Sequence, residues 1–179
     1  IRKREAKRLS LRFTRKRKLM LTKEISRQYV AILKEELIPA MGCTEPISIA
    51  YAVAKARAVL GEFPLSAKLE VSGNIVKNAK SVTVPHTGGM RGIVSAFAAG
   101  LAAGNADAEL ETLSNVTDDQ LVEIARIKET FPVEVATPEA ARVFDIRVTL
   151  CSKDHTAYVR IADTHTNIVC IQKDGETLF

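Results

Sequence analysis

Pro39-Ala-Met-Gly-Cys-Thr-Glu-Pro46 is the most informative stretch of this 179-residue chain, because it combines a helix start with a cysteine. Gly42 permits a tight bend of the backbone. Thr44 can cap a helix, and Pro46 suits its first turn. Apolar residues then recur at helical spacing from Ile47 to Ala58. The pattern predicts a helix over about 46–60, stopped by Gly61.

Cys43 is expected at the positive end of this helix's dipole, beside backbone N–H groups that have no partner within the helix. That position lowers the pKa of a thiol and favours the thiolate, which binds metals and attacks carbon. The alternative is a small buried cysteine beside a well-capped helix, the commoner situation for a lone cysteine.

Helical patterns dominate the chain as far as residue 130. An amphipathic helix is predicted over 22–38, ended by Pro39. Thr117-Asp-Asp-Gln120 has the capping-box pattern that precedes a further helix. Shorter elements are expected between them: a strand over 68–71, a helix over 75–79, a strand over 81–84 and a buried helix over 90–103.

From Phe131 the apolar period changes to two, which predicts strands. They are expected over 132–136, 143–150, 157–162 and 168–172, with a hairpin turn at Ser152-Lys-Asp-His155. Because helices and strands fall partly in blocks, we expect an α+β fold. Its helical N-terminal half should pack on a mixed sheet that has antiparallel strands toward the C-terminus.

The positive charge lies at the N-terminal end. Residues 1–20 hold ten Lys or Arg residues and one acid, Glu5, whereas the whole chain has a net charge of +5. We expect residues 1–20 to be a disordered or non-native leader, since Met20 resembles a native start. A nucleic-acid-binding module that uses this leader is the alternative, although the remaining residues lack a basic stripe with interleaved aromatics.

Bulk composition excludes several classes of protein. No apolar run is long enough to cross a bilayer, so no membrane partner is expected. The odd count of three cysteines argues against a disulfide framework. We expect no signal peptide and a reducing, cytoplasmic setting.

Three polar segments are candidate binding sites. Ser72-Gly-Asn74 follows a predicted strand, and Asn78 lies one helical turn after Asn74, so both amides can face one ligand. The glycines of Pro85-His-Thr-Gly-Gly89 let backbone approach a carboxylate at a helix start. His165-Thr-Asn167 contains an imidazole that can move protons near neutral pH. Each has a structural alternative: a helix cap, a strand-to-helix turn and a turn between strands.

Four segments together resemble the L-cysteine desulfidase family, which is related to the iron–sulfur L-serine dehydratases. They occur in the family's order, and the likeness runs from about residue 22 to the C-terminus. The segments are Gly42-Cys-Thr-Glu-Pro46, Val71-Ser-Gly-Asn-Ile-Val-Lys-Asn78, Val82-Thr-Val-Pro-His-Thr-Gly-Gly89 and His165-Thr-Asn-Ile-Val169.

The resemblance implies a lyase that converts L-cysteine to pyruvate, ammonia and sulfide on a 4Fe–4S cluster. L-serine ammonia-lyase is the alternative reaction, and a non-catalytic binding module is the alternative of another class. The resemblance makes Cys43 one cluster ligand and Glu45 and His165 the local candidates for the general base. The substrate-binding residues it implies are Ser72, Asn74, Asn78, Thr87, Gly88, Gly89 and Asn167.

The resemblance also implies that residues 21–179 form only the N-terminal domain of such a lyase. The family's other cluster ligands belong to a C-terminal half, which is the expected partner, besides a possible second copy. Neither Cys151 nor Cys170 forms a C-x-x-C pair. We therefore expect no complete cluster and no activity in this chain alone.

Overall fold

The structure, a computed structural model, describes residues 22–37, 40 and 42–179. The chain divides into two compact units, residues 1–38 and 39–179. The predicted leader over 1–20 and the helix-ending role of Pro39 fall outside the described residues.

In the first unit, the described residues form helix α2 (Lys23–Glu36). Thr22 caps this helix, because its hydroxyl accepts a hydrogen bond from the Ile25 backbone N–H at 3.2 Å. The amphipathic helix predicted over 22–38 is confirmed over these residues. Its apolar side chains, among them Tyr29 and Leu33, are exposed.

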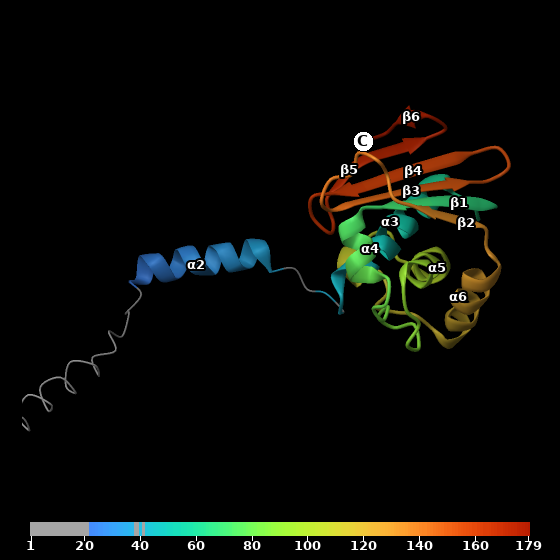
Figure 1. Cartoon of the computed structure of the whole chain (residues 1–179). Helices are drawn as coiled ribbons and strands as arrows, with labels where there is room; N and C mark the ends of the chain where they lie inside the picture. Colours follow the sequence, from blue (N-terminus) through green and yellow to red (C-terminus); the bar gives the residue numbers. More distant parts are fainter. Residues whose placement is uncertain (1–21, 38–39, 41) are drawn as a thin grey trace, which may run out of the picture. The chain divides into compact units, whose positions relative to one another are not determined.

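The second unit has helices on one face of a sheet (Figure 1). Its helices are α3 (Thr44–Leu60), α4 (Gly73–Ala79), α5 (Ile93–Ala103), the short 3-10 helix η1 (Glu109–Glu111) and α6 (Asp118–Thr130). Its strands are β1 (Ser66–Val71), β2 (Val133–Ala136), β3 (Asp145–Cys151), β4 (Thr156–Ala162), β5 (Ile168–Lys173) and β6 (Glu176–Thr177). The predicted α+β class is confirmed.

The strands form one mixed sheet in the order β2-β1-β3-β4-β5-β6. Only the β1–β2 pair is parallel, and the strands from β3 to β6 pair in antiparallel fashion. Antiparallel strands toward the C-terminus were predicted, and the hairpin turn at 152–155 is confirmed by a hydrogen bond from Ser152 N–H to His155 O. Alternate residues of β3 and β4, such as Ile146, Val148 and Val159, are buried under the helices.

Helices α3 and α5 cross at very short range within the core. A Cβ atom added to Gly100 would lie 2.3 Å from the Ala50 carbonyl oxygen. This crossing explains why α5 is buried and rich in small residues, as the sequence predicted for 90–103. The capping box at the start of α6 is likewise confirmed, with Thr117 and Gln120 bonded to each other's backbone.

Two local predictions were wrong. Residues 81–84 form no strand; Thr83 makes only an isolated bridge with Arg91, because the segment turns back at once through the glycine loop. Thr44 is the first residue of α3 rather than its cap; Cys43 occupies the cap position without a capping side-chain bond. Strand β6 and η1 were not predicted, since both are too short to show a period.

Among the described residues, no helix combines the length and the apolar character needed to cross a bilayer.

Candidate functional site

The start of α3 brings a thiol and a carboxylate together. The Cys43 Sγ atom donates a hydrogen bond to Glu45 Oε2 at 3.3 Å. The other carboxylate oxygen, Oε1, accepts a hydrogen bond from the Asn78 side-chain amide at 3.1 Å. Asn78 comes from α4, so two helices supply this group.

An imidazole reaches the same helix start from the far end of the sequence. His165 lies in the turn of residues 163–167 between β4 and β5, and its Nε2 atom is 3.0 Å from Thr44 Oγ1. The Ser48 hydroxyl donates to the His165 carbonyl oxygen at 2.6 Å. Thr44 and Ser48 are four residues apart and therefore lie on one face of α3. We call Cys43, Thr44, Glu45, Asn78 and His165 the Cys43–His165 cluster.

The two acidic groups of the cluster have shifted pKa values. Burial raises the pKa of the Cys43 thiol, and the hydrogen bond to the neighbouring Glu45 carboxylate raises it further. The sequence argument predicted a lowered pKa from the helix dipole and was wrong in direction, because it included neither the burial of Cys43 nor the Glu45 carboxylate. For Glu45, burial opposes ionisation, but hydrogen bonds from its own backbone N–H, Cys43 and Asn78 outweigh burial and lower the pKa.

The glycine-rich loop after Val84 lies beside the cluster. A Cβ atom on Gly42 would be 2.9 Å from Pro85 Cγ, so the residue before Cys43 packs directly on the first residue of this loop. Gly88 and Gly89 both have positive φ and are exposed, and added Cβ atoms there would meet nothing within 4 Å. The loop therefore has open space on one side and Gly42 on the other.

The remaining predicted binding residues divide into structural and exposed ones. The Ser72 hydroxyl caps α4 and donates to Val143 O, and the buried Thr87 hydroxyl donates to Val84 O. The Asn167 amide donates to Ala162 O and closes the 163–167 turn. Asn74 is exposed, one helical turn before Asn78.

The described cysteines do not converge on one metal centre. Cys151 ends β3 at the opposite end of that strand from Asp145, and Cys170 pairs in register with Arg160. Within residues 22–37, 40 and 42–179 there is no group of three His, Cys, Asp or Glu side chains that could hold a metal. Since a 4Fe–4S cluster needs three or four protein ligands in most proteins, the donor set described here does not fit a complete cluster.

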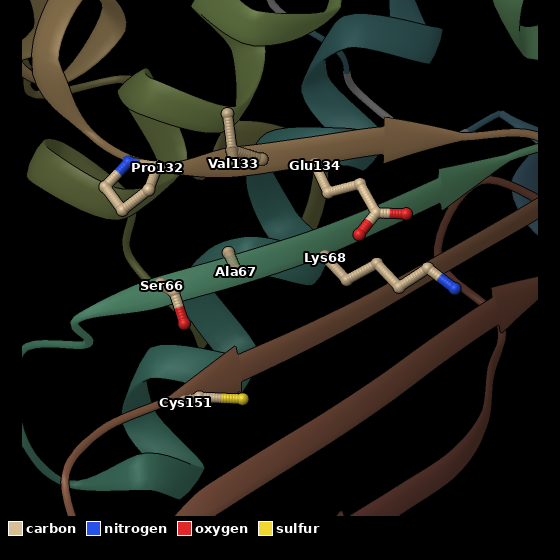
Figure 2. A pocket seen from close by; sticks show the side chains of 7 residues that line it. All are labelled: Ser66, Ala67, Lys68, Pro132, Val133, Glu134 and Cys151. Atoms are coloured by element: carbon tan, nitrogen blue, oxygen red, sulfur yellow. The ribbon is translucent and has the colours of Figure 1, made fainter.

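A separate, open depression of about 460 Å³ lies on the sheet, where β1, β2 and the end of β3 meet (Figure 2). Ser66, Lys68, Glu134 and Cys151 are among the side chains that line it. None of the predicted site residues does, so this depression is distinct from the Cys43–His165 cluster.

Sequence reasoning missed three residues that shape the cluster. Thr44 and Ser48 hold His165, and the Phe144 ring stands edge-on to the imidazole with 4.5 Å between the ring centroids. The i, i+4 spacing of Thr44 and Ser48 was a signal for two hydroxyls on one helix face. Nothing local links Phe144 to a histidine twenty-one positions later.

Curated relatives of this chain are named UPF0597 proteins. One from Desulfitobacterium hafniense is 49% identical over 84% of this chain and 35% of its own length. Others from Finegoldia magna and Treponema denticola are 43% and 40% identical, each over 37% of its own length. No family model and no solved structure matches the chain.

These names correct the family resemblance drawn from the four motifs. The relatives carry the UPF0597 name, and none of those given above is named as a cysteine desulfidase, so the assignment to that family was wrong. The chain spans little more than a third of the length of these relatives. It is similar to one part of a longer UPF0597 protein.

Proposed function

We propose that this chain supplies the Cys43–His165 cluster to the active site of a lyase that converts L-cysteine to pyruvate, ammonia and sulfide. Because the chain spans about a third of its relatives, the activity is proposed for a longer protein that contains it. The observation that carries the proposal is the meeting of a thiol, a carboxylate, an amide and an imidazole from three separate segments.

An α,β-elimination needs a base near the α-proton and a group that holds the substrate's polar ends. Glu45 is the first candidate for the base, because its carboxylate lies within the cluster between the Cys43 thiol and the Asn78 amide. His165 is the second candidate and can deliver a proton to the leaving group. The open glycine loop at Gly88 and Gly89 offers backbone N–H groups to the substrate carboxylate.

The proposed reaction balances without an external oxidant or reductant. The base takes the α-proton, and the electron pair of the Cα–H bond forms the Cα–Cβ double bond. The Cβ–S bond breaks, its electron pair leaves with sulfur as hydrosulfide, and aminoacrylate remains. Aminoacrylate takes up a proton at Cβ to become an imine, which one water hydrolyses to pyruvate and ammonia.

Cys43 is proposed as one ligand of an iron–sulfur cluster, whose other ligands would come from residues outside this chain. Such a cluster, when bound, would supply a Lewis acid for a sulfur leaving group. Because the described residues offer one thiol at this place, no step of the reaction is assigned to the cluster.

The test is an assay for pyruvate and sulfide from L-cysteine, with L-serine in parallel. It uses the longest natural protein that contains this chain, after anaerobic reconstitution with iron and sulfide. Glu45→Gln should lower kcat by about 10²–10⁴-fold, the usual contribution of a general base. His155→Asn, which alters an exposed histidine on a distant hairpin, is the matched control and should retain activity. A folded, reconstituted protein that releases neither product contradicts the proposal.

Metal ligation is tested separately by iron and sulfide content. Cys43→Ser should lower both after reconstitution, whereas Cys151→Ser, at the other end of β3, should not. Equal iron content in the parent, in Cys43→Ser and in Cys151→Ser would overturn the role of Cys43 even if the lyase activity were found. We expect this chain alone to show no turnover.

A further inference from the structure

The dipeptide Phe144-Asp145 connects two segments that carry the candidate site. Its backbone accepts a hydrogen bond from Asp163 N–H to Phe144 O at 3.0 Å and another from Ser72 N–H to Asp145 O at 2.9 Å. Asp163 begins the turn that contains His165, and Ser72 caps the helix that contains Asn78. The dipeptide is therefore bonded to both segments at once.

The Phe144 side chain also closes one side of the His165 imidazole. Phe144 is 8% exposed, and its ring meets the imidazole at an interplanar angle of 61°. Thr44 and Ser48 hold the histidine from α3, at Nε2 and at the carbonyl oxygen. Without the Phe144 ring, the imidazole would keep its contact with Thr44 but lose the packing on its other side.

The Asp145 carboxylate anchors the dipeptide from the open face of the sheet. It is completely buried and accepts hydrogen bonds from Arg160 Nη2 at 2.8 Å, Arg147 Nη2 at 3.1 Å and the Arg142 backbone N–H at 3.1 Å. Two guanidinium groups from adjacent strands thus converge on one carboxylate. Burial opposes ionisation of Asp145, but these hydrogen bonds outweigh it and lower its pKa to about 2.

We propose that Phe144 and Asp145 are positioning residues for His165, with Asp145 fixing the backbone of the dipeptide and Phe144 fixing the imidazole against Thr44. The cluster of Asp145 with Arg147 and Arg160, on the open face of the sheet, thereby orders the His165 side chain, which lies beside the start of α3. The consequence for catalysis rests on the proposed function, but the positioning itself does not.

Histidine resonances measure the positioning without any assay. The chain has three histidines, so ¹³C labelling gives three ring signals that can be assigned by substitution of each. Phe144→Leu should shift the His165 ring signals, because it removes both the ring current and the packing, and should broaden them. The signals of His86 and His155 should not move. Phe144→Tyr keeps the ring and should restore a narrow His165 signal.

Asp145→Asn tests the anchor, because it keeps the size of the side chain and removes its charge. It should broaden the His165 signals with Phe144 still present. Arg160→Lys, which keeps the charge but loses the two-pronged contact, should give a smaller effect. Asp174→Asn is the matched control, since it removes an exposed carboxylate bonded to His155.

Kinetics add a readout that general loosening of the fold would not give. Phe144→Leu should lower kcat by about 10- to 100-fold, the cost of a misplaced catalytic group, with KM little changed, and Phe144→Tyr should recover it. A His165 signal that stays narrow and unshifted in folded Phe144→Leu protein would overturn the positioning role. If no variant or parent shows activity, the proposed function fails, and the resonances still decide the positioning.

Discussion

Thr44 and His165 stand 121 positions apart in the chain, yet Thr44 Oγ1 and His165 Nε2 are 3.0 Å apart. The contact exists because the start of α3 lies beside the turn between β4 and β5. The same helix start holds Cys43 and Glu45, so one packing contact collects most of the candidate site.

Removal of the Glu45 charge should make Cys43 more reactive. In the parent, burial, the hydrogen bond to the Glu45 carboxylate and the repulsion between the two anions all raise the thiol pKa. In Glu45→Gln the burial remains, whereas the two effects of the carboxylate are lost. The pKa of Cys43 should fall, and the thiolate fraction at pH 8 should rise. Alkylation by iodoacetamide should therefore be faster, measured with Cys151 and Cys170 replaced by serine.

The control for this effect is Glu62→Gln, which removes an exposed carboxylate outside the cluster. It should leave the alkylation rate unchanged. A Glu45→Gln protein that reacts at the same rate as its parent, or more slowly, would show that the carboxylate does not govern the thiol.

Gly42→Ala should destabilise the second unit by about 1–3 kcal/mol. The residue has φ +153°, and its new Cβ would lie 2.9 Å from Pro85 Cγ. Pro85→Ala removes that Cγ atom, so part of the cost should disappear in the double variant. Urea unfolding of the four proteins of this cycle measures the coupling. If the changes in unfolding free energy of the two single variants simply add in the double variant, the Gly42–Pro85 contact does not constrain the helix start.

Gly100→Ala should cost at least about 2 kcal/mol of unfolding free energy. Its Cβ would lie 2.3 Å from the Ala50 carbonyl oxygen, which is backbone and cannot turn aside, so α3 and α5 must separate. Thermal and urea unfolding measure the loss.

Gly73→Ala is the matched control for this substitution, since no atom lies within 4 Å of the new Cβ. It should be neutral or stabilise by up to about 1 kcal/mol, because alanine favours helix. Equal effects at the two glycines would contradict close packing of α3 on α5.

The Asp145 network should make stability depend on acid. The folded pKa is about 2, below the ordinary 3.8, so the stabilisation is complete above about pH 4 and is lost as the pH falls through 2. At about 1.4 kcal/mol per pH unit, the free energy of unfolding should fall by about 2 kcal/mol between the ordinary pKa of 3.8 and the folded pKa of about 2. Urea unfolding at a series of pH values from 5 to 2 measures it.

Asp145→Asn provides the comparison for the acid dependence. It should be less stable than the parent at pH 7 by about 1.5–3 kcal/mol, because the partly exposed Arg147 and Arg160 lose the buried anion that they contact. Its stability should then fall less steeply between pH 4 and pH 2. Parallel slopes in the two proteins would assign the acid dependence to other carboxylates.

Local signals account for what the sequence predicted correctly. The capping box at Thr117 and the left-handed stop at Gly61 depend on residues within one helical turn, and both are present. The strands after Phe131 were predicted because one face of the sheet is covered by helices, which imposes a period of two. The strand predicted over 81–84 was wrong, because a short apolar run does not reveal that its chain turns back at Met90.

The sequence by itself determined the α+β class, most element positions and the presence of a cysteine at a helix start, since each follows from neighbours along the chain. Only the tertiary structure decided that Thr44 meets His165, that Asn78 rather than Asn74 meets Glu45, and that Phe144 packs on His165. These contacts join strands and helices far apart in the sequence. They depend on sheet register and on the packing of α3 beside α4 and β4, and no periodic pattern in a single segment records either one.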